Sequence, residues 1–375
     1  MNRHAITILA VLSAVVLILI VARPAQAQTE TVLYNFCSQP NCGDGSQPES
    51  SLTFDSAGNL YGTTYSGGTF GAGTVYELSA NGSGGWNETA LYSFTGGADG
   101  SNPWNSNVIF DNGNLYGTTL NGGASDGGVV WELSPVGASW TETVLYSFGG
   151  EGSDGSGPSG LIMDSAGNLY GTIYGSEGGA VFELNPSGVE QTIFNNGYSA
   201  VIAGLTMHAG NIFGVMASYV LELSPNDGGW TPTTIFVFHN GFPKTTPVFD
   251  KAGNIYGTSI GKNKIGSVYK LTLGKKGGWT KKVVYAFGKG NDPLGAVVLD
   301  SAGDIYGTTS GGYGTVFELV APVGTGKYQE KVLWNFDGTD GQYPGSSLTL
   351  DNAGNLYGAA GGGLHGDGVV FEVTP

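Results

Sequence analysis

The stretch DSAGNLYGTT occupies residues 55–64, and close copies of it recur along the whole chain. Each copy reads glycine, Asn or Asp, Leu or Ile, an aromatic residue and a second glycine. The first glycines of these seven copies are Gly58, Gly113, Gly167, Gly210, Gly253, Gly303 and Gly354. Successive copies lie 43 to 55 residues apart, a period typical of propeller blades and too long for most solenoid repeats.

Each repeat also carries the same series of short apolar segments. An apolar run such as SLTFD (51–55) precedes the core, and segments such as GTVYEL (73–78) and TETVLYSF (141–148) follow it. We name these expected strands a, b (the core), c and d, in chain order. Four strands of about five residues are the content of one propeller blade. The chain has 67 glycines among 375 residues, and their fixed positions within the repeats predict turn residues.

The opening stretch itself predicts a hairpin between strands a and b. Asp55 can accept hydrogen bonds from the backbone a few residues further on, and Gly58 or Asn59 can adopt the positive φ that the turn requires. An aspartate recurs here in six of the seven repeats. These aspartates are therefore expected to build turns rather than to act as acid catalysts.

The order of the segments predicts how the ring closes. After residues 1–27 the chain starts with a d segment at 29–36 and ends with a c segment at 368–373. Residues 29–36 should therefore complete the blade formed by residues 347–373, leaving no unpaired sheet edge between the chain ends. We predict one all-β domain over residues 28–375, a seven-bladed β-propeller of four-stranded blades closed by the N-terminal strand.

The N-terminal residues 1–27 are typical of a secretory signal peptide. A short basic start and an apolar run (5–22) precede Ala25-Gln26-Ala27, a small-residue cleavage pattern. The alternative is an uncleaved membrane anchor, because the run approaches a membrane-spanning length. Either way we expect export to the periplasm or the exterior, where Cys37 and Cys42 should form a disulfide. No further membrane span is expected.

The charge of the chain is strongly uneven. The formal net charge is −16, which argues against nucleic acid as a partner because such binding needs clustered Lys and Arg. Ten of the 12 lysines nevertheless lie between Lys244 and Lys289. They form either a solvated surface or a docking patch for an acidic partner. The docking candidates are Lys262, Lys264, Lys275 and Lys276.

Candidate binding residues fall in the d-to-a and b-to-c connections, which share one face of a propeller. Trp104 stands in a loop where no other repeat has tryptophan, and an exposed indole can stack on a sugar ring. Tyr65, Tyr174 and Tyr343 are similar candidates on the same face. The d-to-a loops also carry an Asp-Gly-x-x-Pro motif, whose aspartates form either turns or an acidic ring that binds a ligand. These are Asp44, Asp99, Asp154 and Asp340.

No catalytic constellation stands out. The expected a strands contain no glutamate, and the histidines have no spacing typical of a triad or a metal site. We therefore expect no metal, no cofactor and no catalytic residue. The favoured hypothesis is a non-enzymatic recognition or scaffold protein that binds a carbohydrate or an extracytoplasmic protein. The alternative is a polysaccharide- or lactone-active hydrolase or lyase with catalytic residues in its loops.

The segments DSAGNLYGTT, GGTFGAGTVYELS and GGWNETALYSF together resemble the GloVer tandem repeat of exported bacterial proteins, which are named for their choice of C-terminal surface anchor. The resemblance covers residues 29–375 and implies export and a repeat architecture, but no reaction. The chain departs from that family in ending at FEVTP without a C-terminal sorting segment. This departure favours a freely secreted or periplasmic protein over an anchored one.

Overall fold

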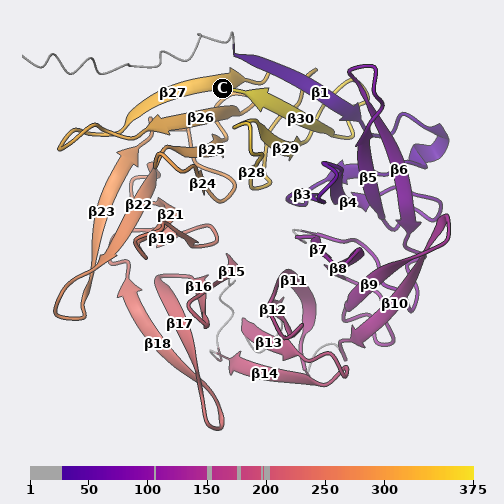
Figure 1. The fold of residues 1–375 in the computed structure, drawn as a ribbon, viewed down its shortest axis with the longest axis horizontal. Coiled ribbons are helices and arrows are strands. Elements are labelled where there is room, and N and C mark those ends of the chain that lie inside the picture. The colour runs from indigo at the N-terminus through magenta and orange to yellow at the C-terminus, as the bar shows by residue number, and fades with distance from the viewer. Residues whose placement is uncertain (1–27, 105–106, 150–153, 175–178, 196, 198–202) are drawn as a thin grey trace, which may run out of the picture.

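The computed structural model describes residues 28–104, 107–149, 154–174, 179–195, 197 and 203–375. In these residues the chain forms seven antiparallel sheets arranged in a ring (Figure 1). The protein is therefore an all-β, seven-bladed propeller, as the repeat count predicted. The expected signal segment, residues 1–27, lies outside the described residues. No helix in the described part of the chain is long and apolar enough to cross a membrane.

The strands, blade by blade, have the following bounds. Blade 1 has β2 (Ser46–Pro48), β3 (Thr53–Phe54), β4 (Leu60–Ser66), β5 (Thr74–Ala80) and β6 (Trp86–Ser93). Blade 2 has β7 (Ile109–Asp111), β8 (Asn114–Thr119), β9 (Val129–Val136) and β10 (Ser139–Ser147). Blade 3 has β11 (Ser156–Met163), β12 (Leu169–Tyr174), β13 (Ala180–Leu184) and β14 (Glu190–Asn195). Blade 4 has β15 (Ala203–His208), β16 (Asn211–Met216), β17 (Tyr219–Asn226) and β18 (Gly229–Val237).

The remaining blades follow the same plan. Blade 5 has β19 (Phe242–Pro243), β20 (Val248–Phe249), β21 (Ile255–Ile260), β22 (Gly266–Leu273) and β23 (Trp279–Ala286). Blade 6 has β24 (Val298–Leu299), β25 (Ile305–Thr309), β26 (Thr315–Val320) and β27 (Gln329–Asn335). Blade 7 has β28 (Thr349–Leu350), β29 (Leu356–Ala360), β30 (Val369–Thr374) and β1 (Thr29–Asn35). A short 3-10 helix, η1 (Pro40–Cys42), follows β1.

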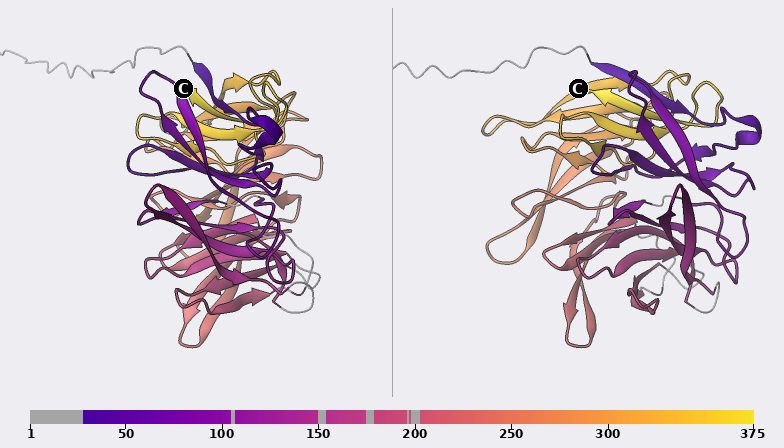
Figure 2. Two further views of the ribbon diagram at one scale, coloured as in Figure 1. Left: turned by 90° about the vertical axis from the view of Figure 1, so that its right-hand side faces the viewer. Right: turned by 45° about the vertical axis from the view of Figure 1, so that its right-hand side comes forward.

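Blade 7 closes the ring with strands from both ends of the chain. Strand β1 pairs antiparallel with β30, with Thr29 opposite Thr374 and Asn35 opposite Val369. The side views show the indigo first strand beside the yellow last strand, where the C-terminus is marked (Figure 2). The predicted closure is confirmed.

Blades 1 and 5 differ from the expected four strands because their innermost strand is split. In blade 1, β2 and β3 both pair with β4, with Pro48 opposite Thr64 and Thr53 opposite Tyr61. The residues between them leave the sheet and then rejoin it.

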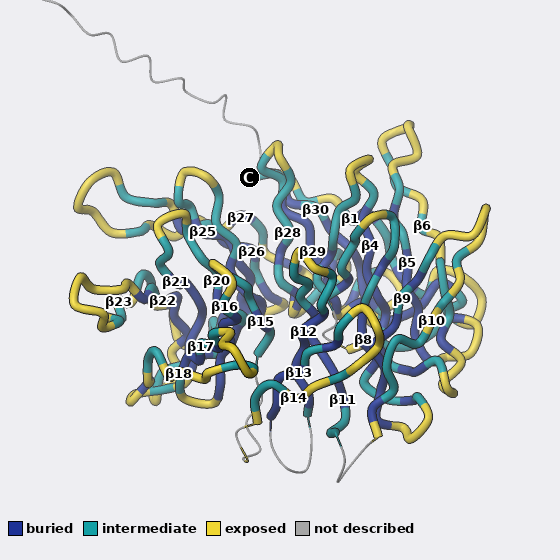
Figure 3. Tube along the Cα trace, turned by 60° about the horizontal axis from the view of Figure 1, so that its bottom comes forward, coloured by how far each residue is buried: buried dark blue, intermediate teal, exposed yellow. Residues whose placement is uncertain are grey.

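Burial follows the position of a strand within its blade. The b and c strands are almost wholly buried, as in β4 and β5, whereas the outermost d strands alternate between exposed and half-buried residues (Figure 3). Among the described residues, the buried side chains form seven apolar clusters, and each includes residues of two neighbouring blades. The propeller is thus held together by apolar contacts between its blades.

The hairpin of the opening stretch is built as expected. The carboxylate of Asp55 accepts hydrogen bonds from the backbone N–H groups of Ala57 (2.8 Å) and Asn59 (2.9 Å) and from the hydroxyl of Tyr61 (3.2 Å). Gly58 has φ +91°, a conformation that glycine adopts without strain. The prediction that this aspartate is a turn residue is confirmed.

The second glycine of the core has a different role from the turn glycine. It lies inside the b strand, where the aromatic ring of the neighbouring c strand covers it. A Cβ at Gly257 would lie 2.6 Å from the hydroxyl of Tyr269, and one at Gly307 would lie 2.7 Å from the ring of Phe317. The repeat therefore keeps this glycine because the blade has no room for a side chain there.

The same c-strand ring receives a phenylalanine from the d strand of the preceding blade. The ring centres of Phe36 and Tyr76 are 4.9 Å apart, and those of Phe287 and Phe317 are also 4.9 Å apart. Their tilted or edge-to-face geometry is the favourable one for aromatic pairs. These pairs join blade 7 to blade 1 and blade 5 to blade 6, as expected for aromatic residues that pack between blades.

A second contact between blades involves half-buried glutamates on the d strands. Burial, with nearby aspartates of the preceding d-to-a loop, raises the pKa of Glu30, Glu88 and Glu142 to about 7. Neither carboxylate oxygen of Glu88 has a hydrogen-bond partner among the described residues. In blade 5, Lys281 takes the equivalent place, with its ammonium group 4.3 Å from the ring centre of Phe238.

This contact predicts a pH-dependent stability. The pKa of Glu88 is higher in the folded than in the unfolded state, so protonation of this carboxyl group stabilises the fold. The stabilisation is complete below about pH 4.5 and is lost as the pH rises through 7. We expect Glu88→Gln to raise the free energy of unfolding at about pH 8 by about 1 kcal/mol, after allowance for solvent screening, and to change it little at about pH 5. Thermal unfolding at the two pH values measures this.

Glu330→Gln is the matched control, because the carboxylate of Glu330 accepts a hydrogen bond from the Tyr285 hydroxyl at 2.6 Å. This variant should gain no stability at the higher pH. If the two variants behaved alike, the unpartnered carboxylate of Glu88 would not be the source of the effect.

Candidate functional site

The d-to-a loops are folded around the aspartate of the Asp-Gly-x-x-Pro motif. The carboxylate of Asp44 accepts hydrogen bonds from the Tyr34 hydroxyl (2.8 Å) and from the backbone N–H of Ser38 (2.9 Å), and Asp44 is fully buried. Asp99 accepts from the Tyr92 hydroxyl at 2.9 Å in the same way. The aspartate thus ties each loop to the aromatic residue of its own d strand.

The other two motif aspartates make equivalent contacts. Asp154 accepts hydrogen bonds from the Tyr146 hydroxyl (2.5 Å) and the Gly149 backbone (2.7 Å). Asp340 accepts from the indole N–H of Trp334 at 2.8 Å. The structure therefore places all four predicted aspartates within their loops, on four separate blade junctions. It does not bring them together.

The residue before the motif proline is held in a strained backbone conformation. Gln47, Asn102 and Tyr343 have φ of 59°, 55° and 48°, whereas a residue before proline normally avoids this region. Such strain costs on the order of 1–3 kcal/mol and is concentrated at functional sites.

Each of these residues donates its backbone N–H to the b-to-c loop of the preceding blade. Gln47 donates to the carbonyl of Asp367 (2.6 Å), and Tyr343 donates to that of Tyr313 (2.6 Å). The two kinds of loop are thereby fixed to one another across the blade boundary. We call the face of the ring that carries both kinds of loop the loop face.

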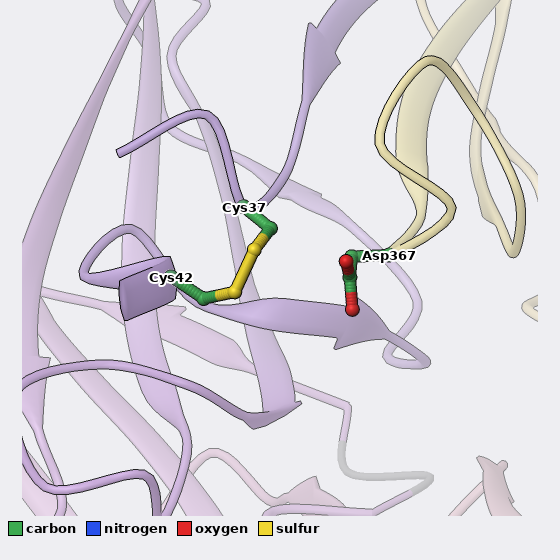
Figure 4. Close-up of side chains that lie close together, drawn as sticks. All are labelled: Cys37, Cys42 and Asp367. Carbon is green, nitrogen blue, oxygen red and sulfur yellow. A yellow bond between two sulfur atoms is a disulfide. The ribbon is translucent and has the colours of Figure 1, made fainter. Parts of the chain in front are cut away.

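A disulfide reinforces one of these loops. Cys37 and Cys42 are joined, as predicted, and Cys42 accepts backbone hydrogen bonds from Gly45 and Gly68, both at 2.8 Å. Asp367, from the b-to-c loop of blade 7, lies beside the disulfide (Figure 4), with a carboxylate oxygen within 4.8 Å of both sulfurs. Because the sulfurs are joined, they offer no thiolate for a metal ion.

Two adjoining cavities open on the loop face where blades 7, 1 and 2 meet. The small cavity, of about 220 Å³, is lined by Gln47, Glu49, Tyr65, Trp104 and Leu120. The large cavity, of about 480 Å³, shares Gln47, Glu49 and Trp104 with it. Further residues that line the large cavity are Gln342, Tyr343, Ser346 and Asp367. We call the two cavities together the loop-face pocket.

The pocket brings together the aromatic residues singled out in the sequence. Trp104 stands between the two cavities, Tyr65 lines the small one and Tyr343 lines the large one. Tyr174 does not line either cavity, but its ring centre lies 6.1 Å from that of Trp104. Trp104 is 36% exposed and Tyr343 is 56% exposed. These side chains therefore present ring surface to a ligand.

Glu49 supplies a carboxylate that lines both cavities. The side chain of Trp104, which lines the same two cavities, favours its ionised form. Partial burial raises the pKa of Glu49, against the opposing effect of the Trp104 side chain. Glu49 was not predicted as a site residue, and neither were Gln47, Gln342 and Asp367.

The repeats do contain a signal for these missed residues. When the Asp-Gly-x-x-Pro motifs are aligned, Glu49 and Trp104 each directly follow the motif proline, and Gln47 and Tyr343 each directly precede it. The aspartate, glycine and proline are kept among repeats, whereas the residues that flank the proline differ. Positions that vary within a fixed loop are where a binding site can be built.

The four docking lysines are not brought together. Lys262 and Lys264 lie in the loop before β22, and Lys275 and Lys276 lie in the loop after it. Strand β22 has eight residues, so the two pairs are roughly 25 Å apart at opposite faces of the ring. All four side chains are exposed.

The fold and its loop-face pocket define a seven-bladed β-propeller whose candidate binding site is made by loops of adjacent blades. The chain belongs to the family described as Gloeobacter/Verrucomicrobia repeat, which matches residues 21–220. This assignment confirms the resemblance seen in the repeats. No curated protein matches the chain.

Solved structures with a similar fold include two lyases. A virginiamycin B lyase from Staphylococcus aureus is 10% identical with a TM-score of 0.61, and the match covers 93% of this chain and 99% of the lyase. A streptogramin B lyase is 13% identical with the same TM-score and the same coverage. At this level of identity the similarity shows a shared fold and no shared activity.

Proposed function

We propose that this protein is an exported, non-enzymatic recognition propeller that binds a carbohydrate in the loop-face pocket. The observation that carries the proposal is the gathering of Trp104, Tyr65 and Tyr343 around two adjoining cavities. Trp104 and Tyr343 come from two different loops and Tyr65 from the end of strand β4. Hydrogen bonds between blades hold the backbone of Tyr343, which donates to the Tyr313 carbonyl, and that of Tyr65, which accepts from the Asn102 side chain. The expected export rests on the signal-like residues 1–27.

The chemistry of the pocket suits a sugar. An aromatic ring offers an apolar face to the C–H groups of a pyranose, while amides and carboxylates bind its hydroxyl groups. Gln47 and Gln342 supply such amides beside the aromatic rings. The large cavity, about 480 Å³, is within the range of small-molecule sites.

Replacement of Trp104 tests the proposal. Trp104→Ala removes the ring shared by both cavities, and loss of a central tryptophan typically costs about 2 kcal/mol of binding free energy, or roughly 30-fold in affinity. We expect a glycan retained by residues 28–375 on a glycan array to bind about 30-fold more weakly to this variant in calorimetry.

Phe70→Ala is the control, because Phe70 is 60% exposed on the same face but lines neither cavity. It should leave the affinity unchanged. Equal affinities for both variants would place the site elsewhere, and failure to retain any glycan would favour a protein partner. The masses of the recovered glycans test whether the protein is an enzyme, because a hydrolase or lyase would shorten the glycans and a binding protein would not.

A further inference from the structure

We infer that the loop-face pocket selects glycans that carry a positively charged amine, with Glu49 as the partner of that amine and Trp104 as the ring beside it. This inference rests on the proposed carbohydrate binding and specifies the chemical class of the ligand. Amino sugars with a free amine belong to that class, whereas neutral, N-acetylated and acidic sugars do not.

The residues that line the pocket favour a cation. Among those described, they include two carboxylates, Glu49 and Asp367, and no lysine, arginine or histidine. Three aromatic rings, those of Trp104, Tyr65 and Tyr343, stand around the same cavities. Carboxylates beside aromatic faces are the usual surroundings of a bound ammonium group, because both attract positive charge.

The charge of the surrounding blades also favours a cationic ligand. All 12 lysines lie between Lys244 and Lys331, in blades 5 and 6, so residues 28–243 and 332–375 contain no lysine or arginine. The same two segments contain 24 aspartates and glutamates. These segments include blades 7, 1 and 2, whose residues line the pocket. The resulting negative potential raises the local concentration of a cationic ligand and repels an anionic one.

The position of Glu49 fits its proposed role. Glu49 lines both cavities together with Trp104 and is accessible to solvent there. Partial burial makes its ionised form less favourable, and an ammonium group placed beside it would remove that penalty. Trp104 and Glu49 thus form one unit that offers a ring face and a negative charge to the same ligand group.

The test compares three oligosaccharides of equal length in calorimetry at low salt and about pH 6, where amines are protonated. The probes are a glucosamine hexamer, an N-acetylglucosamine hexamer and an oligogalacturonate. We expect the glucosamine hexamer to bind at least about tenfold more tightly than the others. Added salt should weaken this binding, as it does for any exposed charge interaction.

Glu49→Gln keeps the size and the hydrogen-bond acceptor of the side chain but removes its charge. We expect it to weaken binding of the glucosamine hexamer by about tenfold and to leave binding of the N-acetylated hexamer unchanged. Asp227→Asn is the control, since Asp227 is exposed in the β17–β18 turn, on the opposite face of the ring. It removes one negative charge without touching the pocket.

The outcomes test the selection for an amine separately from carbohydrate binding itself. If the neutral hexamer bound as tightly as the charged one, or if Glu49→Gln weakened both equally, the selection for an amine would be wrong and carbohydrate binding would stand. If no oligosaccharide bound, carbohydrate binding itself would be wrong.

Discussion

Gly358→Ala is expected to lower the free energy of unfolding by about 3 kcal/mol. A Cβ at this position would lie 2.6 Å from Cζ of Phe371 and 2.9 Å from Cδ2 of Leu348. Both side chains are buried, at 0% and 3% exposure, so neither can move aside without disturbing its neighbours. Interiors packed this closely respond to one added methyl group with strained rotamers and backbone shifts.

The matched control is Gly278→Ala in the β22–β23 turn. A Cβ there meets no atom within 4 Å, and Gly278 does not have a positive φ. Urea unfolding of both variants should show a marked loss of stability for Gly358→Ala and a change within about 0.5 kcal/mol for Gly278→Ala. Similar losses in both would mean that glycine is needed for backbone freedom and not for the space that Phe371 occupies.

This glycine shows where prediction from the sequence reached its limit. The repeat period and the order of segments were sufficient to predict seven blades and their closure. The turn at Gly58 was also predicted, because its chemistry is local to the hairpin. The second glycine was correctly placed within strand b, but the need for glycine there could not be predicted, because a ring of another strand covers the backbone at this point. A packing contact between two strands cannot be recognised in the local sequence pattern of one strand.

The candidate site was likewise only partly predictable from the sequence. Trp104 and Tyr343 could be selected because each stands out against its equivalents in other repeats. Glu49 could not be selected in isolation, because a single loop carboxylate is unremarkable until Trp104 from the next blade is placed beside it. For the lysines the sequence suggested a single patch, but strand β22 separates Lys264 from Lys275. Residues that are close in the sequence lie far apart in the structure when a strand runs between them.

Removal of residues 28–36 is expected to convert the protein from a protease-resistant to a protease-sensitive form. The deletion removes β1 and so leaves β30 with an unpaired edge. It also removes Phe36, a fully buried residue whose ring lies 4.9 Å from that of Tyr76 in blade 1. Loss of one buried phenylalanine typically costs about 3–5 kcal/mol, and here the seam between blades 7 and 1 opens as well.

Limited proteolysis of the deleted chain, followed by mass spectrometry of the first fragments, measures the effect. The first cleavages should fall in blades 7 and 1, because these two blades lose their shared contacts while the others keep theirs. Thr29→Ala with Thr31→Ala is the control, since both residues are exposed on β1 and the strand itself remains. If the deleted chain resisted protease as well as this control, the pairing of β1 with β30 would contribute little, and the ring would owe its integrity to the aromatic contacts at its other seams.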